Sequence, residues 1–171
     1  MRPTQNNVLL KGTSGCGKTY FLVDWIRTEI IPYSDAKVIT NLPLGEVPSN
    51  HFKPPKFEGE TFLDRIAKRC KVDPDEIHER FELLEESELD KWAKGQGGPW
   101  DLPRAGETYM ILDEFASYCT KFLSNEVRAK WIEWFAKARH RNVYNICISQ
   151  TDKKIPRDIV VEFGERWQLS D

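Results

Sequence analysis

The chain has 171 residues, 40% of them hydrophobic and 30% charged, which is enough apolar material for one globular core. Its 25 basic and 27 acidic residues give a net charge of −2, which excludes a general basic field, so any contact with nucleic acid must be local. The four cysteines are dispersed without a C-x-x-C pair, and no stretch reaches the ~20 apolar residues of a membrane helix, so we expect no zinc site, no disulfide and no membrane span.

The first element in chain order is a short strand that leads into a phosphate-binding loop. The apolar residues 8–10 predict the strand. The glycine-rich segment after it matches the G-x-x-x-x-G-K-[ST] pattern in full, with Gly12, Thr13, Ser14, Gly15, Cys16, Gly17, Lys18 and Thr19. Glycines let successive backbone N–H groups turn toward phosphate oxygens, and the following helix adds its positive N-terminal dipole. We predict that these residues bind ATP, with Lys18 neutralising phosphate charge and Thr19 ligating Mg²⁺.

An amphipathic helix and a second strand follow the loop. Apolar residues recur at helical spacing from Phe21 to Ile30 and stop before Pro32. Residues 37–43 then predict a short strand closed by a proline. A strand, a crossover helix and a second strand form a β-α-β unit, whose two strands are parallel.

Residues 45–106 interrupt the alternation of strands and helices. Their pattern predicts charged helices followed by a glycine stretch at residues 95–98. One helix begins at Asp73, an N-cap, with Pro74 at its first position, and its apolar side continues through Phe81 to Leu84. We predict an insertion of surface helices that ends in a mobile glycine loop.

A buried strand further along the chain ends in two adjacent carboxylates. Residues 109–112 are apolar at consecutive positions, as in a parallel strand covered on both faces, and Asp113 and Glu114 follow directly. This is a Walker B pattern. We predict that Asp113 holds Mg²⁺ and that Glu114 polarises the attacking water, a pair that favours hydrolysis over phosphoryl transfer to a small molecule.

A helix and another strand complete the chain's alternation. The helix places five apolar residues on one face, which indicates core packing: Val127, Trp131, Trp134, Phe135 and Ala138. Residues 144–151 predict the strand, expected beside the Walker B strand. Gln150 at its polar end is a candidate sensor of the γ-phosphate, because an amide can donate to an oxygen and orient water.

The densest basic cluster, Lys137-Ala138-Arg139-His140-Arg141, lies between that helix and that strand. Three interpretations stay open. The charges can complement a helix C-terminus, Arg139 or Arg141 can reach the γ-phosphate of a neighbouring subunit as an arginine finger, or the cluster can contact a nucleic-acid backbone. We expect the cluster at the same sheet edge as Gln150.

The order of these motifs resembles the zonula occludens toxin family. The likeness rests on the phosphate loop, on Thr40-Asn41-Leu42-Pro43, on Asp113-Glu114, and on the spacing from Arg139-His140-Arg141 to Ser149-Gln150-Thr151. That family comprises assembly ATPases of filamentous phages and is similar to the FtsK-HerA group of DNA-pumping ATPases. The resemblance implies an oligomeric ring, a hexamer, acting on phage DNA with virion or portal proteins, in the host cytoplasm or at the inner face of its membrane. Filamentous-phage members continue into a membrane span and a further domain, so we expect an excised ATPase domain or a soluble packaging-type relative.

We therefore predict a three-layer α/β/α P-loop NTPase with a mostly parallel sheet, a single domain over residues 1–171. It hydrolyses ATP with Mg²⁺ to power virion assembly, DNA export or genome packaging. A small nucleoside or nucleotide kinase is an alternative, but it needs an arginine-rich lid, and residues 95–107 hold only Arg104. A nucleotide-binding assembly switch without turnover is another, and it would leave Glu114 idle.

Overall fold

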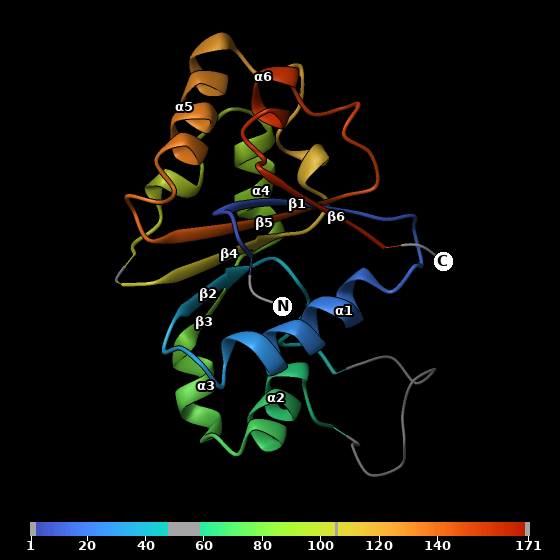
Figure 1. The fold of residues 1–171 in the computed structure, drawn as a ribbon, viewed down its shortest axis with the longest axis vertical. Coiled ribbons are helices and arrows are strands. Elements are labelled where there is room, and N and C mark those ends of the chain that lie inside the picture. The colour runs from blue at the N-terminus through green and yellow to red at the C-terminus, as the bar shows by residue number, and fades with distance from the viewer. Residues whose placement is uncertain (1–2, 48–58, 105, 170–171) are drawn as a thin grey trace.

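The centre of the molecule is a six-stranded sheet, seen in a computed structural model that describes residues 3–47, 59–104 and 106–169. The strand order is β3-β2-β4-β5-β1-β6, and every neighbouring pair is parallel (Figure 1). The strands are β1 (Asn7–Lys11), β2 (Lys37–Thr40), β3 (Phe81–Leu83), β4 (Thr108–Leu112), β5 (Val143–Ser149) and β6 (Glu165–Gln168). Since all of them run the same way, the loops that follow them meet at one edge of the sheet.

Helices cover both faces of the sheet (Figure 1). One face carries α1 (Lys18–Trp25), its π-helical continuation η1 (Ile26–Ile30), α2 (Phe62–Cys70) and α3 (Pro74–Arg80). The other carries α4 (Glu86–Ala93), α5 (Asn125–Ala136) and α6 (Arg157–Val160), with the short 3₁₀ turns η4 (Pro99–Asp101) and η5 (Phe115–Ser117). These three layers confirm the predicted α/β/α class. No described helix combines the length and the hydrophobicity that crossing a bilayer needs.

Residues of each central strand alternate between two hydrophobic cores. Val8 and Leu10 of β1 pack toward α1, whereas Leu9 packs toward α5. In β4, Ile111 belongs to the first core and Met110 to the second. Both faces are covered, which explains why these strands read as continuous apolar runs in the sequence.

A buried polar chain crosses the second core and ties β1 to β5. Asn145 Nδ2 donates to Asn7 Oδ1 at 2.8 Å, and Trp134 Nε1 donates to Asn145 Oδ1 at 2.9 Å. Asn7 Nδ2 in turn donates to the backbone carbonyls of Phe135 and Glu162. Asn7 and Asn145 also face each other in the strand register, so a slip of one residue would leave several buried polar groups unpaired.

The predicted helical insertion contains a strand that the sequence analysis missed. The N-cap at Asp73 is confirmed, because its side chain accepts from the Asp75 N–H at 2.8 Å. The helix ends at Arg80, however, and the next three residues form β3 beside β2, so the continuation through Phe81 to Leu84 was wrong. A three-residue strand is too short to show a period of two. Residues 48–58 of the predicted insertion lie outside the described residues.

Two other features differ from the sequence-based expectation. One end of the glycine stretch is packed against the rest of the structure, because Gly98 and Pro99 are buried and a methyl group on Gly98 would lie 2.4 Å from the Trp100 ring. The strand β6, with only Trp167 buried, was not predicted at all.

Candidate nucleotide-binding site

The phosphate loop needs its glycines for local reasons. Gly15 and Gly17 have φ angles of 82° and 83°, in the left-handed region where other residues are strained. Gly17 is also the N-cap of α1, which begins at Lys18. At Gly12 the constraint is space, since a methyl group there would lie 2.6 Å from Cys16 Sγ. The loop therefore places the N-terminus of α1 at the carboxyl edge of the sheet.

Lys18 points back into the curve of this loop. Its Nζ donates to the carbonyl oxygens of Gly12 and Thr13 at 2.9 and 2.6 Å. A lysine held by two loop carbonyls keeps its charge close to where phosphate oxygens would meet the loop N–H groups. Thr19 is half-buried in the first turn of α1 and lines, with Lys18, the cavity described below.

The backbone of Asp113 is clamped by two side chains. Its N–H donates to Asn41 Oδ1 at 2.7 Å, and Asn41 Nδ2 donates back to the Asp113 carbonyl at 2.9 Å. Tyr118 donates its hydroxyl to that carbonyl at 2.9 Å. Asn41 entered the sequence analysis only through the resemblance, and Tyr118 did not enter it. The spacing of either from Asp113 gave no signal, because the Asn41 contact depends on the pairing of β2 with β4 and the Tyr118 contact on the turn of η5.

Burial raises the pKa of the Asp113 carboxyl, and the nearby Glu114 carboxylate raises it further. Two contacts oppose this shift, a hydrogen bond from the Glu114 N–H to Asp113 Oδ1 at 2.8 Å and the positive charge of Lys18. A half-buried carboxylate with a raised pKa gains from a cation beside it.

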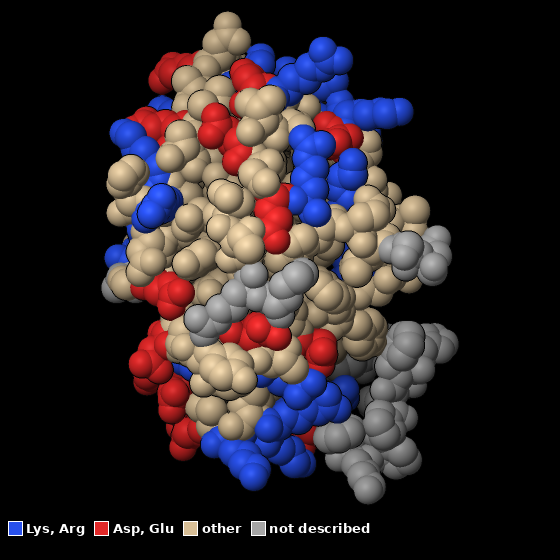
Figure 2. Space-filling model, in the orientation of Figure 1, with Lys and Arg blue, Asp and Glu red and all other residues tan. Residues whose placement is uncertain are grey.

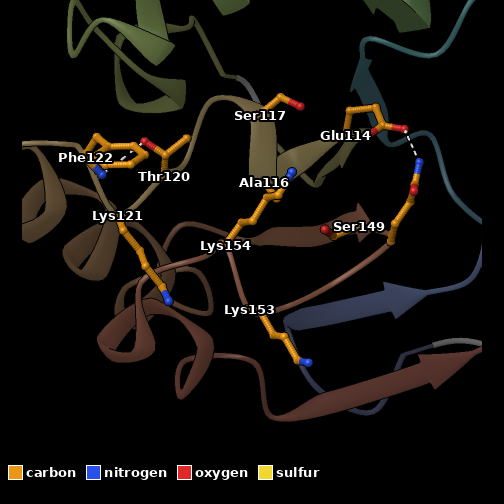
Figure 3. A pocket seen from close by; sticks show the side chains of 10 residues that line it. Glu114, Ala116, Ser117, Thr120, Lys121, Phe122, Ser149, Lys153 and Lys154 are labelled. Carbon is orange, nitrogen blue, oxygen red and sulfur yellow. Dashed lines mark hydrogen bonds between the residues drawn. The ribbon is translucent and has the colours of Figure 1, made fainter.

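Glu114 leaves the strand end in an unusual backbone conformation. Its φ is 52°, in the left-handed region, and it precedes the 3₁₀ turn η5. Non-glycine residues in that region cost free energy and often occur at functional sites. The Glu114 side chain is exposed, and Gln150 Nε2 donates to Glu114 Oε1 at 3.4 Å, a long hydrogen bond drawn as the dashed line that ends at Glu114 in Figure 3.

The strand order brings these groups together. β5 lies between β1 and β4, so Gln150, which follows β5, is placed between the phosphate loop and the two carboxylates. One cavity of about 770 Å³ is lined by residues 14–20 together with Asp113, Glu114 and Gln150. The predicted phosphate, metal, water and sensor residues therefore share one cleft, with Gly12 and Thr13 behind it as hydrogen-bond acceptors for Lys18.

The arginines of the basic cluster lie elsewhere. Arg139 and Arg141 precede β5, whereas Gln150 follows it. In a parallel sheet the two arginines therefore lie at the amino-terminal ends of the strands, and Gln150 lies at the carboxyl ends. The expectation that they share Gln150's edge was wrong. Arg139 is exposed, and the Arg141 guanidinium lies over the Trp134 ring at 5.3 Å. Neither belongs to the cleft within its own chain.

Arg104, which precedes β4, lies at the amino-terminal ends of the strands, as Arg139 and Arg141 do. Its guanidinium lies over the same Trp134 ring as that of Arg141, at 4.6 Å. Burial lowers the pKa of Arg104, and the charge of Arg141 lowers it further. A lid for phosphoryl transfer would need this arginine at the carboxyl edge, where the phosphate loop is.

No protein-family model matches the chain, and no curated protein does. Among solved structures, the N-terminal domain of zonular occludens toxin from Neisseria meningitidis is similar, with a TM-score of 0.57 and 17% sequence identity over 99% of this chain and 78% of that one. The Hef helicase domain from Pyrococcus furiosus aligns with a TM-score of 0.45 and 12% identity over 96% of this chain and 35% of that chain. The first match confirms the predicted likeness at the level of the fold, which is that of a P-loop NTPase.

Proposed function

We propose that this chain hydrolyses ATP with Mg²⁺ and works as a ring, a hexamer, that drives phage DNA export, virion assembly or genome packaging in the host cytoplasm. The observation that carries the hydrolytic part is the single cleft in which the phosphate loop faces Asp113, Glu114 and Gln150. The assembly role, the DNA and the virion or portal partners rest on the resemblance to zonula occludens toxin proteins.

The donors in the cleft fit a magnesium nucleotide. The Thr19 hydroxyl and the Asp113 carboxylate are hard oxygen ligands, and Asn41 and Tyr118 fix the backbone beneath Asp113. When bound, Mg²⁺ neutralises charge on the phosphate oxygens. Lys18 and the loop N–H groups bind those oxygens from the other side.

Glu114 and Gln150 would act on the water that attacks the γ-phosphate. Glu114 is exposed at the cleft and can accept a proton from that water, while Gln150 donates a hydrogen bond to Glu114 and can turn to a phosphate oxygen instead. Because the 3.4 Å hydrogen bond between them is long, exchanging it for a phosphate contact costs little.

Phosphate release from Mg-ATP, measured with and without a nucleoside acceptor, tests this function. We expect release without an acceptor, and a Glu114→Gln variant that still binds Mg-ATP but turns over at least ~100-fold more slowly, as for loss of a general base. Glu79→Gln, on the exposed side of α3, is the matched control and should hydrolyse normally.

The outcomes separate the alternatives. Phosphate transfer that depends on an acceptor would indicate a kinase, although Arg104 lies at the wrong edge for a lid. Tight ATP binding without release in the unsubstituted chain would indicate an assembly switch. Ordinary hydrolysis by Glu114→Gln would contradict the role proposed for Glu114.

A further inference from the structure

A second hollow adjoins the nucleotide cleft and continues across the surface. Its first part, a cavity of about 590 Å³ whose lining side chains are drawn in Figure 3, begins at Glu114 and Gln150. A neighbouring cavity of about 590 Å³ shares Lys121 and Lys153 with it and reaches α6. We call the continuous surface the basic trough and define it by Lys121, Phe122, Lys153, Lys154 and Arg157.

The four cations of the basic trough form no ion pair with any described residue. Two nearby acids are already occupied, because Asp152 pairs with Lys11 at 3.1 Å and Asp158 with Arg128 at 2.8 Å. The hydrogen bond from Lys11 holds the pKa of the Asp152 carboxyl below its usual range. Figure 2 shows basic side chains gathered around α6 and the segment before it. In a chain of net charge −2, such a local excess of positive charge favours an anionic ligand.

Phe122 gives the trough an exposed aromatic ring. It is 97% exposed, the highest value among the large hydrophobic residues of the described chain, and follows Lys121 directly. Positive charges that follow a backbone, combined with an aromatic ring free to stack, are typical of sites for single-stranded nucleic acid. In a duplex the bases are already stacked on each other and offer Phe122 no free face, so the ring favours a single strand.

At one end, the trough meets side chains that also line the nucleotide cleft. Glu114 and Gln150 line both cavities and are joined by the hydrogen bond described above. A strand in the trough and a γ-phosphate in the cleft would therefore contact opposite sides of the same pair of side chains.

We propose that the basic trough binds a single strand of nucleic acid, with its cations on the phosphates and Phe122 stacked on a base, and that the Glu114–Gln150 pair couples this strand to ATP hydrolysis. The coupling rests on the proposed function. The binding does not, because it uses residues outside the nucleotide cleft.

Fluorescence anisotropy with a labelled single-stranded DNA oligonucleotide tests the binding. We expect Phe122→Ala to weaken it about 10-fold, since stacking contributes roughly 1–3 kcal/mol per base. Four phosphate contacts predict a ~50-fold loss of affinity between 50 and 200 mM salt, and Lys153→Gln/Lys154→Gln should halve the slope of log affinity against log salt.

Matched controls lie on other surfaces. Tyr33→Ala removes an aromatic ring that is 68% exposed, and Lys91→Gln/Lys94→Gln removes two lysines at the end of α4, so both should bind the oligonucleotide normally. Unchanged melting temperatures would show that all variants are folded. Normal binding by the trough variants would overturn the proposal. Equal binding of duplex DNA with no effect of Phe122→Ala would overturn the stacking, and equally strong competition by polyglutamate would indicate an acidic protein partner instead.

Phosphate release with and without the oligonucleotide tests the coupling. The unsubstituted chain should be stimulated, and Lys153→Gln/Lys154→Gln should keep the basal rate but lose the stimulation. Lys18→Ala should bind the oligonucleotide without hydrolysing ATP. If the unsubstituted chain binds the oligonucleotide in the trough but never hydrolyses ATP, the proposed function is refuted and the trough proposal stands. Hydrolysis that no oligonucleotide changes would refute the coupling alone.

Discussion

Asp113 and Glu114 are neighbours in the chain but occupy different environments. Asp113 is half-buried above a backbone clamped by Asn41 and Tyr118, whereas Glu114 is exposed and turned by its left-handed φ of 52°. A fixed, partly desolvated carboxylate suits a metal ligand, and an accessible one suits proton transfer. The contrast in environment is the physical basis for assigning them different roles.

The clamp by Asn41 gives the first prediction at this scale. Asn41→Ala leaves the Asp113 N–H without its acceptor, which should cost roughly 1–3 kcal/mol of unfolding free energy. Because the carboxylate loses its fixed position, the Mg²⁺ concentration for half-maximal hydrolysis should also rise. Titrating Mg²⁺ at saturating ATP measures this, and a loss of stability with an unchanged Mg²⁺ requirement would show that Asn41 is only structural.

Gln150 should respond to nucleotide rather than stabilise the fold. Its side chain is exposed, so Gln150→Ala should change the unfolding free energy by less than about 0.5 kcal/mol. Turnover should nevertheless fall at least about 10-fold, as when a donor to a developing charge is lost, with ATP binding retained. Thermal melting and phosphate release check the two parts. A variant that melts several degrees lower yet hydrolyses normally would contradict the sensor role.

Most residues of the cleft could be predicted from the sequence because each belongs to a short contiguous motif. The phosphate loop and Asp113-Glu114 carry their chemistry in adjacent positions. Tyr118 could not be found this way, since its hydroxyl reaches the Asp113 carbonyl only after η5 turns the chain back. Phe122 could not be found from the sequence either, because only the structure shows that its ring is exposed.

At the scale of elements, α2 begins with a reciprocal pair of hydrogen bonds. Thr61 Oγ1 accepts from the Asp64 N–H at 3.1 Å, and Asp64 Oδ2 accepts from the Thr61 N–H at 2.9 Å. The hydrogen bond from the Thr61 N–H, followed by one from the Thr61 hydroxyl to Asp64 Oδ2 at 2.8 Å, lowers the pKa of the Asp64 carboxyl. Such a capping box stabilises a helix start by about 1 kcal/mol.

The lowered pKa predicts how this stabilisation depends on pH. A carboxyl whose pKa is lower in the folded than in the unfolded chain stabilises the fold above about pH 4 and loses this effect as the pH falls through the folded value. Asp64→Asn should therefore melt below the unsubstituted chain at neutral pH, by a gap that closes in acid. Melting curves from pH 7 to pH 3 measure the gap, and a constant gap would show that the charge is not involved.

Strands with a strong apolar signal were predicted, and strands that depend on their neighbours were not. β4 is buried along its length and β5 at every position but Tyr144, so both sequences are mostly apolar. β3 has three residues and β6 only Trp167 buried, because both lie at the edges of the sheet. Their pairing comes from the exposed hydrogen-bonding groups of β2 and β1, which local sequence does not reveal.

At the scale of the whole molecule, the order of the strands decides what meets the nucleotide. The sequence predicted parallel strands and the motifs at their ends, but not that β5 would lie between β1 and β4. The distance of Arg139 from its own cleft follows from the same topology. That a neighbouring subunit supplies Arg139 to the cleft stays a prediction.

A mixing experiment tests that prediction. Arg139→Ala is preferable to a change at Arg141, whose stacking on Trp134 contributes to stability. If the arginine acts between subunits, mixing inactive Arg139→Ala chains with Lys18→Ala chains should restore partial turnover, because some interfaces then pair an intact loop with an intact arginine. An arginine finger contributes about 10³-fold or more, so the recovered rate should be easily measured.

The control mixes Lys18→Ala with Glu114→Gln chains. Lys18 and Glu114 line the same cleft of one chain, so every chain in this mixture has a damaged cleft. No mixed interface then has an intact site, and no turnover should return. Activity of the unsubstituted protein should also rise more steeply than in proportion to its concentration. Proportional activity together with no rescue by Arg139→Ala chains would indicate a monomer that acts without the neighbour's arginine.

The position of β1 in the sheet also sets the order in which the site can form on the ribosome. Residues 37–112 can join β3, β2 and β4 early, but β1 pairs only with β5 and β6, which begin at Val143 and Glu165. The phosphate loop is thus among the first segments synthesised and among the last to be fixed in place, and pairings so distant in sequence form slowly. Until β5 pairs with both β4 and β1, the hydrogen-bonding groups on one side of β4 stay unpaired and can pair with other chains. Nucleotide, which requires the joined sheet, would hold only finished molecules in the native state.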